Sequence, residues 1–127
     1  MAKVLYVGLG GFIGSIFRYL LALYAPRLFG THLPFGTLAV NVLGGLLIGF
    51  IMELSQLHTN FSPELRLFLT TGIMGGFTTF STFSYETVNL FSAGSYTAGI
   101  LNVCLNLFLS LGGVVLGKYI SRLLFGL

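Results

Sequence analysis

Residues 75–86 read GGFTTFSTFSYE and lie near the middle of an otherwise apolar stretch. Two adjacent glycines are followed by hydroxyl side chains interleaved with phenylalanines, and the run ends in an acid, Glu86. A helix that faces lipid would carry leucine, isoleucine and valine here, because polar groups inside a bilayer need a partner or water. The run therefore belongs in the protein interior, against other helices or water.

The composition around this run is that of a membrane protein. Of 127 residues, 7% are charged and 55% are hydrophobic, whereas roughly 25% of an average soluble domain is charged. A hydrocarbon core about 30 Å thick needs roughly 20 mostly apolar residues per helix. Four stretches are that long, at residues 4–24, 37–57, 65–91 and 96–120. We therefore expect a single all-α integral membrane domain over residues 1–127, with four transmembrane helices.

The charged residues give only a weak indication of orientation. Four spans place both termini on the same side, where Lys3, Arg66, Lys118 and Arg122 also lie, while Arg27 lies near the other side. The positive-inside rule then favours cytoplasmic termini by a small margin. The net charge of +3 is distributed as in membrane proteins, and we expect no nucleic-acid partner.

Glycines recur at a spacing that brings helices close together. Two glycines four residues apart leave a bare patch on one helix face, which lets a neighbouring backbone approach closely. Four such pairs predict a compact bundle, and the small space inside four helices favours an oligomer. The pairs are Gly10 and Gly14, Gly45 and Gly49, Gly72 and Gly76, and Gly113 and Gly117.

Polar residues form stripes on the second and fourth spans. The first stripe consists of Thr37, Asn41, Gly45 and Gly49, and the second of Asn102, Asn106, Ser110, Gly113 and Gly117. Steps of three or four residues keep each stripe on one face. Hydrogen bonds between helices, worth about 0.6 kcal/mol each, explain either stripe alone. Both stripes together with residues 75–86 favour a polar pathway.

The third span is polar on more than one side. On a regular helix one side carries Thr79, Thr82, Glu86 and Asn89, with Phe80 and Phe83 flanking it. We expect Gly75 and Gly76 to weaken the helix just before this segment. Irregular backbone at membrane depth is tolerated only where it is buried in protein or lines a cavity, and its freed carbonyls can hold a cation.

The chemistry of these groups indicates a small solute without deciding its charge. Asn amides and Ser or Thr hydroxyls donate hydrogen bonds, and aromatic ring edges carry partial positive charge. Such groups can replace the hydration of a small, hard anion without trapping it on a fixed cation. The hydroxyls also accept hydrogen bonds, and Glu86 would suit a cation, so both alternatives stay open.

Two strings, GTLAVNVLGG at residues 36–45 and GGFTTFSTFS at residues 75–84, resemble the Fluc (CrcB) family of bacterial fluoride channels. The resemblance covers the whole chain, including an arginine late in the first span. It implies four-span subunits with a third helix broken at its centre. It further implies an antiparallel, dual-topology homodimer with two pores in the bacterial inner membrane. The implied function is passive, selective export of fluoride from the cytoplasm.

The resemblance also implies roles for individual residues. The backbone carbonyls of Gly75 and Thr78 would hold a structural sodium ion on the dimer axis. Arg18 would be structural or attract anions to a vestibule, and Glu86 would lie near a pore mouth. The remaining residues of the implied fluoride pathway are Asn41, Thr79, Phe80, Phe83, Asn106 and Ser110.

Two other functions remain alternatives. A proton-coupled multidrug exporter of the small four-helix type uses an acid deep in its first span, where this chain has Arg18 and no acid. Glu86 would have to serve as a displaced proton site. The other alternative is a non-conducting accessory subunit of a larger membrane complex. No nucleophile–base pair or metal-ligand cluster is visible in the sequence, so we do not expect an enzyme. Glu53 and Glu64 are expected to be interfacial.

Overall fold

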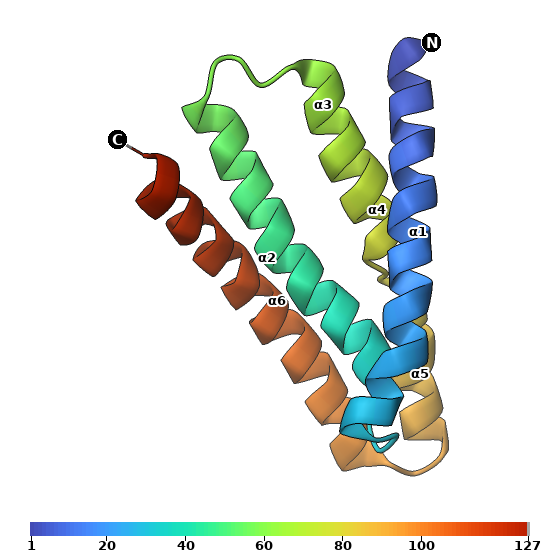
Figure 1. Ribbon diagram of the computed structural model, residues 1–127. Coiled ribbons are helices and arrows are strands. Elements are labelled where there is room, and N and C mark those ends of the chain that lie inside the picture. The colour runs from blue at the N-terminus through green and yellow to red at the C-terminus, as the bar shows by residue number, and fades with distance from the viewer. Residues whose placement is uncertain (127) are drawn as a thin grey trace.

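A computed structural model describes residues 1–126, and all secondary structure in this part of the chain is helical. There are three long helices, and a segment of shorter ones lies between the second and the third (Figure 1). The elements in chain order are α1 (Ala2–Phe29), α2 (Phe35–Leu57), α3 (Pro63–Leu67), the π-helix η1 (Phe68–Met74), α4 (Gly75–Phe77), α5 (Ser81–Ser92) and α6 (Tyr96–Phe125).

Helices α1, α2 and α6 are each long and apolar enough to cross a membrane. Their bounds contain the first, second and fourth predicted spans and exceed them by up to five residues at an end. The start of α1 and the end of α6 lie toward the same end of the molecule (Figure 1). The third predicted span, residues 65–91, corresponds instead to α3, η1, α4 and α5, with residues 78–80 outside any helix.

The paired glycines form two close helix contacts, which confirms the prediction from their spacing. The first contact joins α1 to η1 and α4: a Cβ atom on Gly10 would lie 2.8 Å from the Gly72 Cα, and one on Gly76 would lie 2.5 Å from the Gly11 carbonyl oxygen. The second joins α2 to α6, where a Cβ on Gly45 would lie 2.6 Å from the Ser110 carbonyl oxygen. Two pairs of helices therefore pack backbone against backbone.

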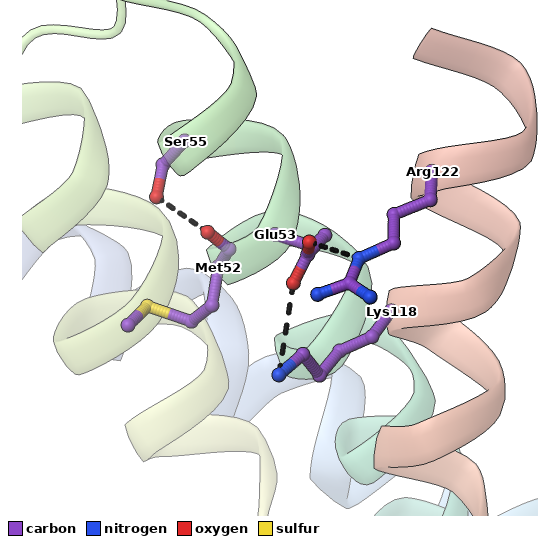
Figure 2. Close-up of polar contacts among 5 residues, drawn as sticks. All are labelled: Met52, Glu53, Ser55, Lys118 and Arg122. Carbon is purple, nitrogen blue, oxygen red and sulfur yellow. Dashed lines mark hydrogen bonds and ion pairs between the residues drawn. The ribbon is translucent and has the colours of Figure 1, made fainter. Parts of the chain in front are cut away.

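An ionic cluster joins the other end of α2 to α6. Glu53 lies near the end of α2, as expected for an interfacial residue, but its side chain is only 4% exposed. Its carboxylate accepts a hydrogen bond from the Arg122 Nε, and its second oxygen lies 3.7 Å from the Lys118 Nζ (Figure 2). One turn of α6 thus supplies two cations to one buried acid.

We expect Glu53→Gln to lower the melting temperature of the purified protein by a few degrees. The substitution keeps the side-chain shape but removes the charge that Arg122 and Lys118 neutralise. Arg122→Gln should have a similar effect, and the double variant should lose less than the sum of the two. Additive losses would contradict a direct ion pair, because residues in contact couple in a double-mutant cycle.

Candidate functional site

The site is built around residues 78–80, three non-helical residues that separate α4 from α5. Thr78 has an extended backbone, with φ −84° and ψ 160°, so the chain leaves α4 here. The side chain of Thr79 then starts the next helix, since its Oγ1 accepts a hydrogen bond from the Thr82 N–H at 3.2 Å. This is the bond by which a threonine caps a helix N-terminus. The hydroxyl-rich run therefore contains both the residues at which the helix stops and the threonine that caps the start of α5.

A cavity of about 530 Å³ lies beside this interruption. Its lining combines residues from α2, the interrupted segment, α5 and α6. All six residues that the family resemblance assigns to the pathway, apart from Arg18 and Glu86, border it. The lining consists of Asn41, Thr78, Thr79, Phe80, Phe83, Val103, Asn106, Leu107, Ser110, Leu111 and Val114.

Asparagines connect the helices around this cavity. The Asn41 Nδ2 donates to the Asn106 Oδ1 at 2.9 Å, across the contact between α2 and α6. Asn106 donates in turn to the carbonyl and side-chain oxygens of Asn102, and the Asn102 Nδ2 donates to the Thr87 Oγ1 at 2.9 Å. Asn102 is fully buried. The polar stripes of α2 and α6 therefore face each other and also serve as hydrogen-bonded links between helices.

Other polar groups of the cavity are available to a ligand. The Ser110 Oγ is buried and has no hydrogen-bond partner among the described residues. The rings of Phe80 and Phe83 lie with centroids 5.5 Å apart and planes inclined by 55°. Because the planes are tilted, ring edges as well as faces are presented along the wall. No charged side chain is among the described residues that line this cavity.

Arg18 and Glu86 border a second cavity, of about 300 Å³. Thr79 lines both cavities. The Thr37 Oγ1 donates to the Glu86 Oε1 at 2.9 Å, while the Glu86 Oε2 is buried without a hydrogen-bond partner among the described residues. Thr82 also borders this cavity, so Thr79, Thr82 and Glu86 share a side as the helical spacing predicts.

The sequence analysis did not identify the apolar wall of the larger cavity. That wall comes from α6 and consists of Val103, Leu107, Leu111 and Val114. The steps of three and four residues were visible in the sequence, but apolar residues at this spacing occur on every span. The Asn102–Thr87 hydrogen bond was also missed, because it joins two helices whose relative rotation the sequence does not specify.

Comparison with known proteins places the chain in a family. Residues 5–118 match the family described as "CrcB-like protein, Camphor Resistance (CrcB)". A Clostridium perfringens protein named "Fluoride-specific ion channel FluC" is 55% identical over 121 residues, which cover 95% of this chain and 94% of the relative. A protein of the same name from Agrobacterium fabrum is 45% identical over 125 residues, covering 98% of this chain and all of the relative.

The three long apolar helices and this match describe the same kind of protein, a helical one that passes through the membrane more than once. The similarity extends over almost the whole length of the chain and of its relatives, so it includes every residue of the larger cavity. This chain belongs to the CrcB family.

Proposed function

We propose that the chain is a fluoride channel whose pathway follows the larger cavity. The observation that carries this proposal is the meeting of Asn41, Thr79, Phe80, Phe83, Asn106 and Ser110 around one space. These residues come from three separate parts of the sequence, and they are the same residues that the family resemblance assigns to the pathway. The relatives' printed name, which describes ion channels rather than enzymes, supports the same conclusion.

The cavity suits an anion better than a cation. Carboxylates would be expected around a cation, and none is among the described residues that line the larger cavity. The free Ser110 hydroxyl can donate a hydrogen bond, and the edges of Phe80 and Phe83 carry partial positive charge. The absence of a lysine or arginine from the described lining means that an anion is solvated without being trapped.

Arg18 fits a role at the approach to this pathway. Its cavity is separate from the larger one but shares Thr79 with it. The positive charge there raises the local concentration of anions before they lose their hydration. Glu86 would lie near the same mouth, held by Thr37.

Residues 63–92 would form the third membrane pass in chain order, a span broken at its centre. Helices α3, η1, α4 and α5 follow one another along this pass, with residues 78–80 as the break. Two copies would assemble as an antiparallel, dual-topology homodimer with two pores. Phe80 supports a partner, because its ring is 80% exposed although it borders the polar pathway. The weak charge bias of the chain is compatible with insertion in both orientations.

The break also fits a structural sodium ion held by the carbonyls of Gly75 and Thr78. The Thr79 N–H donates to the Asn41 side chain instead of the Gly75 carbonyl, its acceptor in an unbroken helix. Gly75 is exposed, and a Cβ there would meet nothing closer than 3.8 Å, so a second copy can approach it. Backbone carbonyls are ligands that a hard cation accepts, and the ion would offset the repulsion between the carbonyl dipoles that the two copies bring together.

Export of fluoride from the bacterial cytoplasm across the inner membrane then needs no energy source. Fluoride enters cells as its neutral acid, dissociates inside and accumulates there. A passive pathway releases it down its own gradient. No P-loop motif is visible in the sequence, which supports passive transport.

One observation favours proton coupling instead: the Glu86 Oε2 is buried and has no hydrogen-bond partner within the described part of the chain. Fluoride efflux from proteoliposomes, measured with and without an imposed pH gradient while ionophores clamp the voltage, separates the two functions. A channel releases fluoride at the same rate with and without a pH gradient. The rate of the Glu86→Gln variant should likewise not depend on the pH gradient. Efflux that occurs only with a proton gradient would establish an exchanger.

A further inference from the structure

The side-chain amide of Asn41 forms hydrogen bonds with both backbone polar groups of Thr79, its N–H and its carbonyl. Its Oδ1 accepts from the Thr79 N–H at 3.0 Å, and its Nδ2 donates to the Thr79 carbonyl at 3.0 Å. These are two of the groups that the interruption of the helix deprives of their usual partners. Backbone groups left unpaired at membrane depth cost several kcal/mol each. Asn41 of α2 therefore replaces the two hydrogen bonds that Thr79 loses at the break.

Both hydrogens of the Asn41 side-chain amide already donate hydrogen bonds within the protein. An asparagine amide carries two donor hydrogens, and Asn41 donates to both the Thr79 carbonyl and the Asn106 Oδ1. A passing anion would have to displace one of these bonds to receive a hydrogen from Asn41. The Ser110 hydroxyl has no such competing partner among the described residues.

We infer that Asn41 is a positioning residue, which holds the backbone of Thr79 so that the interrupted segment keeps one conformation. In this way Asn41 places the Thr79 side chain beside both cavities and the Phe80 ring against the larger one. The consequence for transport rests on the fluoride pathway proposed above. The pairing itself is a property of the fold and holds whichever solute passes.

Few residue types can replace Asn41 in this role. The position must donate and accept at once within the reach of a short side chain. Aspartate keeps an acceptor for the Thr79 N–H but cannot donate to its carbonyl when ionised, and alanine or leucine does neither. Glutamine has the same groups on a longer stem that has to fit between α2 and the interrupted segment.

Amide hydrogen exchange tests this inference in the full-length protein. In wild-type protein labelled with 15N-threonine, we expect the Thr79 amide to be protected as strongly as that of Thr78, which donates to the Met74 carbonyl at 3.0 Å. Asn41→Ala should speed exchange at Thr79 by about tenfold, because one local hydrogen bond is lost. Thr78, whose acceptor is unaffected, should change little and serves as an internal control.

Ser110→Ala is the matched variant. It removes a polar group from the same cavity without touching the Thr79 peptide, so Thr79 should keep its protection while fluoride efflux falls. An Asn41→Ala protein with reduced efflux and unchanged Thr79 exchange would overturn the inference and make Asn41 a direct anion contact. Rapid Thr79 exchange in the wild type would overturn it without any variant. Absence of fluoride efflux in the wild type would instead contradict the proposed function and leave the exchange result valid.

Discussion

Replacing Phe83 with isoleucine is expected to reduce fluoride efflux from proteoliposomes by about tenfold or more, and Phe80→Ile should do the same. Isoleucine preserves an apolar side chain but has no ring edge with partial positive charge. An anion that has shed its water would lose that contact where both rings border the cavity. A tenfold loss corresponds to about 1.4 kcal/mol, which is within the range of one aromatic contact.

The control for these variants is Phe108→Ile. Phe108 lies on α6, is 65% exposed and does not border the larger cavity. Its replacement should leave efflux at the wild-type rate. All three variants should elute like the wild type in size-exclusion chromatography, since none fills a close helix contact. Wild-type efflux in both Phe80→Ile and Phe83→Ile would contradict the assignment of the pathway to this cavity, but not the family.

Gly117→Ala is expected to destabilise the protein strongly or to prevent its assembly. A Cβ at this position would lie 2.0 Å from the Leu46 carbonyl oxygen and 2.8 Å from the Phe50 nitrogen. Both atoms belong to the backbone of α2, so the overlap can be relieved only by moving α6 away from it. Such overpacking costs typically 1–3 kcal/mol.

Gly112→Ala on the same helix is the matched comparison. A Cβ there would have nothing within 4 Å, and alanine favours a helix over glycine by up to about 1 kcal/mol. Gly112→Ala should therefore melt at the wild-type temperature or above it. Because the chain has no tryptophan, melting is followed by a method that does not use tryptophan fluorescence, or by loss of the monodisperse chromatography peak. Equal melting temperatures for the two variants would contradict the close contact between α2 and α6.

The parts of the fold that depend on local spacing were predictable. Glycines at steps of four lie on one helix face whatever the rest of the chain does, and Gly45, Gly49, Gly113 and Gly117 all meet backbone atoms as expected. The long apolar helices follow from length and composition. The convergence of Asn41 and Asn106 could be expected for the same reason, because each lies on the glycine-containing stripe of its helix.

The details of the third predicted span were harder to predict from the sequence. Gly75 and Gly76 were expected to weaken the helix, yet both lie inside α4, where Gly76 packs against Gly11. The non-helical residues follow at 78–80, where the Thr79 N–H donates to Asn41 and the Thr79 carbonyl accepts from it, although Asn41 is 38 residues away in the sequence. The π-helix η1 was not anticipated either, since no local residue pattern specifies it. The break at residues 78–80 and the π-helix η1 therefore depend on contacts with residues far away in the sequence.

Fluoride efflux from vesicles containing the wild-type protein, followed with a fluoride-selective electrode and compared with chloride efflux, tests the proposed pathway most directly. A pathway of hydroxyls, ring edges and no fixed charge predicts rapid fluoride release, well above that of protein-free vesicles and of chloride. Vesicles that retain fluoride as protein-free vesicles do, although the protein is inserted and assembled in them, would contradict it.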